Sequence, residues 1–67
     1  MNIPRQIAAL RRDLRRHEQE IERVAKLRAA GDVNVLALPQ FVDKYVAEIQ
    51  VRIAQLKAEI SNLEAEN

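Results

Sequence analysis

Two heptad patterns separated by a short connection are the feature that most restricts how this chain can fold. From residue 3 to residue 24, apolar residues recur at alternating spacings of four and three, with one histidine filling the single gap. From residue 42 to residue 63, the same alternation runs without a break. Such spacing aligns side chains along one side of a long α-helix, where they can form a coiled-coil contact. The residues of this predicted contact, here called the hairpin seam, are Ile7, Leu10, Leu14, His17, Ile21, Val24, Val46, Ile49, Ile53, Leu56, Ile60 and Leu63.

Capping residues indicate where the two helices begin and end. Asn2 is a suitable N-cap, and Pro4 is tolerated in a first helical turn. Gly31, the only glycine in the chain, stands where a left-handed residue commonly ends a helix, and Pro39 suits the start of the next one. We therefore expect one all-α domain over residues 1–67, with helices over about 3–30 and 39–66 and an apolar connection over about 31–38.

The short connection favours an antiparallel helical hairpin with one definite register. If the chain folds back near residue 35, residues whose numbers add up to 70 face each other, and every heptad layer then meets another, as Leu14 meets Leu56. The same register is expected to bring Glu20 close to Arg52. Because exposed ion pairs contribute little, the apolar layers should decide the register.

Chain length favours association of the hairpin with further chains. The 67 residues are fewer than the ~70–80 at which a single core usually suffices, and no cysteine is present to form disulfides or thiolate metal sites. We therefore expect a homodimer in which two hairpins form an antiparallel four-helix bundle. The alternatives are a higher oligomer and a bundle completed by another protein.

Two surfaces compete for the contact between hairpins. One is the open flank of the seam, which is apolar near Tyr45 and mostly charged elsewhere. The other is a row of small residues on the second helix, which could equally be helix-favouring residues on a solvated face. Because burial of an unpaired charge is costly, we expect the second helices to form the middle of the dimer. This small-residue stripe consists of Ala47, Val51, Ala54, Ala58, Ser61 and Ala65.

The connection is unusually apolar for a loop, since exposed turns are normally polar. Its apolar residues either fold over the end of the hairpin as a small terminal core, the interpretation we favour, or form a docking tip for a partner. Under the second interpretation the candidate partner interface extends beyond the stripe. The terminal core would consist of Val33, Val35, Leu36 and Leu38 beside Leu27, Phe41 and Tyr45. The candidate partner interface comprises Val35, Leu36, Phe41 and Tyr45 in addition to residues of the stripe.

Basic residues gather on the outer face of the first helix. Residues 1–30 carry eight basic and four acidic groups, whereas residues 31–67 carry three basic and six acidic groups. Such a ridge could follow the phosphates of a nucleic acid. We favour a solvated face, because the whole chain has a net charge of only +1 and no aromatic residue is interleaved for base stacking. The basic ridge consists of Arg5, Arg12, Arg16, Arg23 and Lys26.

Residues for catalysis or metal binding are few. The sequence has no cysteine and a single histidine, and a hairpin offers no deep pocket. His17 has Asp13 and Glu20 within reach, but one histidine does not make a metal site. We interpret His17 as a polar seam residue that helps to set the register. We expect no enzymatic activity, no cofactor and no metal.

The sequence therefore favours a protein–protein interaction or assembly module, a small adaptor or chaperone-like hairpin that acts through self-association and binding of a partner helix. A nucleic-acid-binding regulatory bundle is the alternative. We expect a cytoplasmic protein without membrane contact, because no run of ~18 apolar residues exists and arginines interrupt any signal-like segment near the N-terminus. The sequence does not identify the partner.

Overall fold

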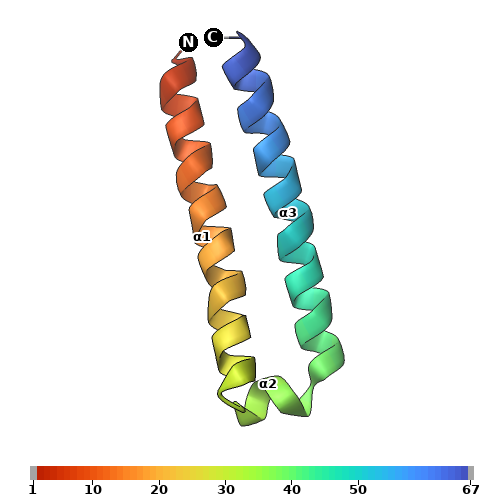
Figure 1. The fold of residues 1–67 in the computed structure, drawn as a ribbon. Coiled ribbons are helices and arrows are strands. Elements are labelled where there is room, and N and C mark those ends of the chain that lie inside the picture. The colour runs from red at the N-terminus through yellow and green to blue at the C-terminus, as the bar shows by residue number, and fades with distance from the viewer. Residues whose placement is uncertain (1, 67) are drawn as a thin grey trace.

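The fold, seen in a computed structural model that describes residues 2–66, consists of three α-helices. Two are long, α1 (Ile3–Ala29) and α3 (Pro39–Glu66), and a short helix, α2 (Val33–Ala37), lies between them in the chain. Figure 1 shows α1 and α3 side by side and antiparallel, with both ends of the chain at one end of the rod and α2 at the other. The rod measures 47 × 16 × 14 Å. The prediction of an all-helical fold with two long helices packed together is confirmed.

Local hydrogen bonds explain the limits of α1. At its start the Asn2 side chain accepts a hydrogen bond from the backbone N–H of Arg5 at 3.1 Å. At its end Gly31 has a φ of +76°, the left-handed conformation that the sequence predicts there. The N–H of Gly31 donates to the Arg28 carbonyl at 3.1 Å, and the N–H of Asp32 donates to the Leu27 carbonyl at 2.9 Å. This pair of bonds is the Schellman arrangement, which satisfies carbonyls that a helix end leaves free.

The connection contains a short helix, which its apolar sequence does not predict. The Asp32 side chain caps α2 by accepting a hydrogen bond from the Val35 N–H at 3.1 Å. Leu38 follows α2, and its carbonyl accepts from the N–H of Val42 at 3.2 Å as α3 begins. The connection is therefore hydrogen-bonded backbone, with both of its ends fixed to the long helices.

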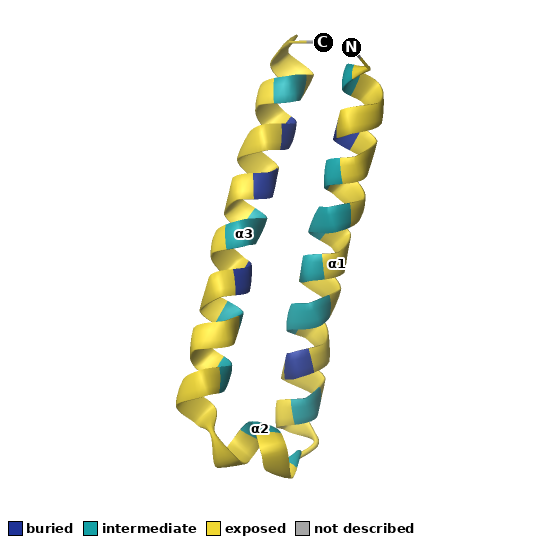
Figure 2. Cartoon of the chain, turned by 180° about the vertical axis from the view of Figure 1, so that it is seen from behind, coloured by how far each residue is buried: buried dark blue, intermediate teal, exposed yellow. Residues whose placement is uncertain are grey.

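The core is a single row of side chains between α1 and α3. Leu56 is fully buried at 0% exposure, and Ile7, Val24, Ile49 and Ile60 are also buried. Figure 2 shows that the buried and partly buried positions of both helices face each other along the rod. With one row of contacts, most seam side chains keep one edge in solvent. The half-buried seam residues are Leu10, Leu14, His17, Ile21, Val46, Ile53 and Leu63.

Polar contacts cross the seam on both sides and show the register. On one side Asp13 lies 3.8 Å from Arg52, and their numbers add up to 65. On the other side Arg11 lies 2.6 Å from Glu64, and their numbers add up to 75. The seam between them is therefore centred on a sum of 70, as its apolar layers predict.

The two sides of the seam, here called flanks, carry different polar residues. The tyrosine flank comprises Asp13, Glu20, Tyr45 and Arg52. The ion-pair flank comprises Arg11, Arg28, Asp43 and Glu64.

The expected contact of Glu20 with Arg52 is wrong, because Glu20 instead accepts a hydrogen bond from Tyr45. A flank residue in an antiparallel pair lies between two residues of the other helix that are one heptad apart. Tyr45 and Arg52 are such a pair for Glu20. The heptad pattern therefore narrows the partner of Glu20 to two residues without choosing between them.

Candidate interaction surface

Large apolar side chains are exposed at the end of the hairpin that α2 forms. Four of them are between 54% and 78% exposed, and they are here called the apolar tip: Val33, Leu36, Leu38 and Phe41. The expected terminal core is wrong for these residues. Because α2 has five residues, about one and a half turns, it cannot turn all of its apolar side chains toward the seam. Only Val35 among the apolar residues of α2 is half-buried.

Two hollows adjoin on the tyrosine flank and form what is here called the flank groove. The first has a volume of about 570 Å³ and extends past His17 to Ile49. The second has a volume of about 510 Å³ and extends past Leu27 to Val35, beside the apolar tip. Arg23 and Tyr45 line both hollows, so the two lie next to each other. The flank groove therefore lies along the half of the rod nearer to α2, with walls from both long helices.

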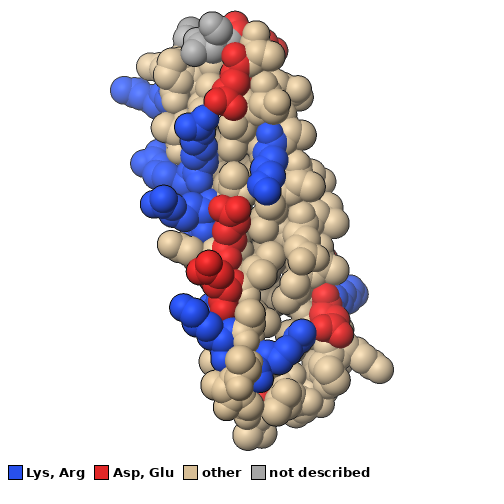
Figure 3. Space-filling view, viewed as in Figure 1, with Lys and Arg blue, Asp and Glu red and all other residues tan. Residues whose placement is uncertain are grey.

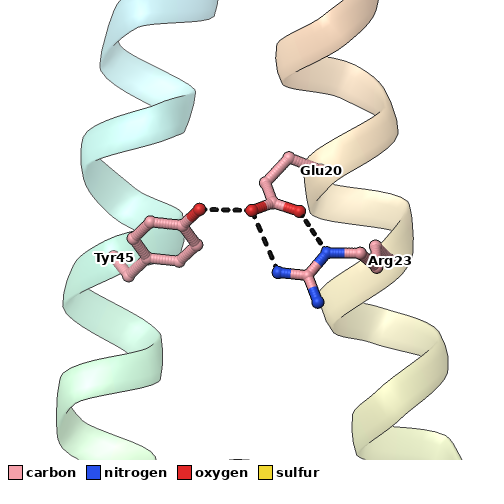
Figure 4. A network of polar contacts seen from close by, with 3 residues as sticks. All are labelled: Glu20, Arg23 and Tyr45. Carbon is pink, nitrogen blue, oxygen red and sulfur yellow. Dashed lines mark hydrogen bonds and ion pairs between the residues drawn. The ribbon is translucent and has the colours of Figure 1, made fainter.

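A three-residue network crosses the flank groove. Figure 4 shows the Glu20 carboxylate held between Arg23 of the same helix and Tyr45 of α3. The Arg23 Nε donates to Glu20 Oε1 at 2.5 Å, and its Nη2 donates to Oε2 at 3.0 Å. The Tyr45 hydroxyl donates to the same Oε2. Glu20 thus joins the two long helices through one carboxylate.

The network changes the acidity of its members. The hydrogen bonds from Arg23 and then from Tyr45 favour the charged carboxylate and lower the pKa of Glu20 from 4.5 to about 2. Conversely, the hydrogen bond to Glu20 raises the pKa of Tyr45, because it favours the protonated phenol. At neutral pH the charged acceptor and the neutral donor therefore stay paired.

His17 has one hydrogen-bonding partner within its own helix, the backbone carbonyl of Asp13. Its Nδ1 lies 2.8 Å from the Asp13 carbonyl oxygen and 3.6 Å from the Asp13 carboxylate. The ring is half-buried in the seam, as predicted for a polar seam residue. Among residues 2–66, no group of three or more His, Asp or Glu side chains is placed to hold a metal ion.

The basic ridge is exposed along α1. Figure 3 shows basic side chains gathered along the α1 side of one face, with much of α3 uncharged on that face. Arg23 belongs to this ridge by sequence, but its guanidinium is paired with Glu20. Within the described residues, the other four members make no ion pair: Arg5, Arg12, Arg16 and Lys26.

The small-residue stripe is exposed throughout its length on α3. Val51, its largest member, is 58% exposed. Its other members are Ala47, Ala54, Ala58, Ser61 and Ala65, which offer little apolar area each. The stripe and the tyrosine flank are thus both accessible to a partner.

The flank groove and its network are the features that sequence reasoning missed. The available signal was Tyr45 beside the seam, at a position whose number adds up to 65 with that of Glu20. Within the described helices, no stretch combines the length and apolar character required to cross a bilayer. Comparison of the chain with protein-family models, with curated proteins and with solved structures gives no match.

Proposed function

We propose that this chain is a protein–protein interaction or assembly module, a small adaptor or chaperone-like hairpin that acts through self-association and binding of partner helices. The observation that carries the proposal is the apolar tip, where four large apolar side chains are more than half exposed on a narrow rod. Contiguous exposed apolar residues are uncommon on monomeric proteins and mark interaction sites. A partner that covers the tip would remove this surface from water.

The flank groove supports a helix as the occupant. It runs beside the seam between α1 and α3 and continues to Val35 near the tip. An amphipathic helix commonly binds such a groove through apolar side chains on successive turns. One helix lying in the groove would add a second row of contacts to a core that now consists of a single row.

Self-association into a four-helix bundle is the simplest form of this proposal. A chain of 67 residues is below the size at which one core usually suffices, and most of its seam residues are only half-buried. A second hairpin supplies two helices at once and covers the flanks of both seams.

The test is sedimentation velocity over a wide range of protein concentration. We expect a concentration-dependent dimer that weakens at least tenfold when Leu36→Asp and Phe41→Asp are combined. Ala54→Glu is the matched control, because it places a charge on the small-residue stripe instead of the tip. A chain that stays monomeric at every concentration, or a tip variant that associates like the wild type, would contradict the proposal. Loss of association in Ala54→Glu alone would place the contact on the stripe.

Nucleic-acid binding is a second candidate, favoured by the basic ridge. Arg5, Arg12, Arg16 and Lys26 are exposed, and among residues 2–66 they have no acidic partner. If the ridge binds phosphates, labelled RNA or DNA should shift at micromolar protein, and the shift should weaken steeply with salt. Replacing Arg12 and Arg16 by Glu should abolish it. No shift at near-physiological salt would dismiss this candidate.

A further inference from the structure

We infer that the partner on the tyrosine flank is a second copy of this chain, oriented so that both apolar tips lie at the same end and each α1 packs against the partner's α3. This inference rests on the proposed self-association and adds its geometry, in which the tyrosine flank takes the place of the small-residue stripe that the sequence favours as the contact. Two hairpins stacked side by side with two-fold symmetry have two simple orientations. A rotation axis along the rod keeps the tips together, whereas an axis across the rod places them at opposite ends.

The charges of the two helices favour the axis along the rod. Residues 1–30 carry eight basic and four acidic groups, and residues 31–67 carry three basic and six acidic groups. An axis along the rod stacks each basic α1 on an acidic α3. An axis across the rod stacks α1 on α1 and α3 on α3, so that like charges meet. Complementary charges across an interface select the first orientation.

Individual residues agree with this orientation. Rotation about an axis along the rod leaves every residue at its own height, so residues that are level within one hairpin are also level between two. Arg23 lines the flank groove, and Glu48 on α3 is within one residue of being level with it, since their numbers add up to 71. Glu48 is three residues after Tyr45 and therefore lies on the same side of α3. Each dimer would thus bring Arg23 close to Glu48 twice.

An axis across the rod gives no comparable contact between opposite charges. It would place Arg16, near the middle of α1, opposite its own symmetry mate. Arg16 also lines the flank groove, so two guanidinium groups would meet at the centre of the contact. Like charges that face each other oppose association.

The apolar tips provide a second, independent argument. With the axis along the rod, the exposed residues of both tips lie at one end, where Phe41, four residues before Tyr45, can be covered by the partner. With the axis across the rod, the tips lie at opposite ends of a rod 47 Å long and stay exposed. Only the first orientation brings both tips to the same end of the dimer, where one can cover the other.

The ion-pair flank is a poorer surface for the second copy. Arg11 and Glu64 already cross it at 2.6 Å, and Arg28 and Asp43 cross it at 2.9 Å. A partner on either flank would have to remove water from paired charges, because Asp13 pairs with Arg52 and Glu20 pairs with Arg23 on the tyrosine flank. The two flanks differ in shape. The hollows lie instead on the tyrosine flank, where a partner's side chains can enter them.

The absence of cysteine allows a direct test of the orientation, because a single introduced cysteine carries the only label. Ala37→Cys marks the α2 end, outside the flank groove, and Arg5→Cys marks the other end of the rod. Distances between spin labels are then measured in the dimer formed by each full-length variant. Helices about 10–12 Å wide should place both pairs of labels within roughly 20–30 Å in the proposed dimer.

Other arrangements give different distances. Label distances near 47 Å, the length of the rod, at both positions would show that the two tips lie at opposite ends of the dimer. A short distance at the tip with a much longer one at residue 5 would show contact end to end. Either result overturns this inference and leaves self-association standing. A chain that is monomeric at every concentration overturns both.

A charge reversal separates the tyrosine flank from the small-residue stripe. Glu48→Arg should weaken the dimer about tenfold, and adding Arg23→Glu should restore most of the loss. Helix content measured on each variant by circular dichroism shows whether the hairpin itself is intact. Glu22→Arg is the control, because Glu22 is exposed and lies one residue from Arg23 without lining the groove. An unchanged Glu48→Arg dimer would contradict contact on this flank.

Discussion

The Tyr45 hydroxyl on α3 donates a hydrogen bond to the carboxylate of Glu20 on α1 and so joins the two helices beside the seam. Arg23 holds the same carboxylate from its own helix. Tyr45 is the only tyrosine in a chain without tryptophan. Its ionisation can therefore be followed by absorbance without interference from another such residue, and the contact can be tested directly.

Titration of Tyr45 tests the hydrogen bond. The bond to Glu20 raises the pKa of Tyr45, so the tyrosinate absorbance band should develop at a pH above the ~10 of a free tyrosine. Glu20→Gln removes the charged acceptor and should bring the midpoint back toward that of a free tyrosine. Glu22→Gln is the control, since Glu22 lies outside the network. Equal midpoints in the wild type and Glu20→Gln would rule out the contact.

Acid should destabilise the hairpin through Glu20. The pKa of Glu20 is about 2 in the fold against 4.5 ordinarily. The unfolded chain therefore binds a proton first, and the stabilisation by Glu20 is present above pH 4.5 and lost as the pH falls toward 2. Melting temperatures should fall more steeply over this range in the wild type than in Glu20→Gln. Parallel curves for the two proteins would show that Glu20 has no such effect.

Leu56 should be the most sensitive apolar position in the seam. It is the side chain with 0% exposure, and truncation of a fully buried leucine to alanine typically costs about 2–5 kcal/mol. Leu56→Ala should therefore lower the thermal midpoint by circular dichroism strongly or leave the chain largely unfolded. Val51→Ala, at a position 58% exposed, should change stability by less than about 0.5 kcal/mol. Similar losses in the two variants would mean that the seam does not pack as described.

Gly31 should resist substitution because of its backbone conformation. A side chain in the left-handed region costs roughly 1–2 kcal/mol, and the φ of Gly31 is +76°. Space is not the obstacle, since a Cβ there would meet nothing within 4 Å. Gly31→Ala should lower stability in urea or thermal unfolding, and Gly31→Asn should lower it less, because asparagine tolerates this conformation better. An alanine variant as stable as the wild type would contradict the left-handed turn.

Replacing His17 by leucine should stabilise the hairpin. His17 fills the single gap in the apolar seam of α1 and is half-buried there. A leucine would add apolar burial worth about 1 kcal/mol, roughly half of the value for full burial. Thermal unfolding should then move upward by several degrees, in line with about 4–8 °C per kcal/mol for a small domain. A lower midpoint in His17→Leu would show that the hydrogen bond to Asp13 matters more than the apolar contact.

The parts of the fold that depend on spacing could be predicted from the sequence. A side chain on a helix returns to the same side every heptad, so the spacing alone places Leu14 and Leu56 in the seam; Leu56 is buried and Leu14 is half-buried. Gly31 was predicted because few residues tolerate a positive φ. These inferences rest on backbone geometry, which one sequence is enough to specify.

The features that depend on which of two neighbouring side chains makes a contact could not be predicted from the sequence. Glu20 can reach Tyr45 or Arg52, and the side-chain conformations that select Tyr45 leave no trace in the heptad pattern. The exposure of Val33 and Leu36 depends on the length and direction of α2, a helix of five residues with no apolar repeat of its own. The flank groove arises from both effects, since Tyr45 and Val35 line it.

The constant register of the seam has a consequence for the order of folding. Contacting residues have numbers that add up to about 70, so their separation along the chain grows steadily from the α2 end to the end of the rod where both chain ends lie. Closing a short loop costs less entropy than closing a long one. The hairpin should therefore close like a zipper from α2, with amide hydrogen exchange slowest near Val24 and fastest toward the chain ends. The apolar tip belongs to the segment that closes first, which makes it available to a partner before the open end of the rod has formed.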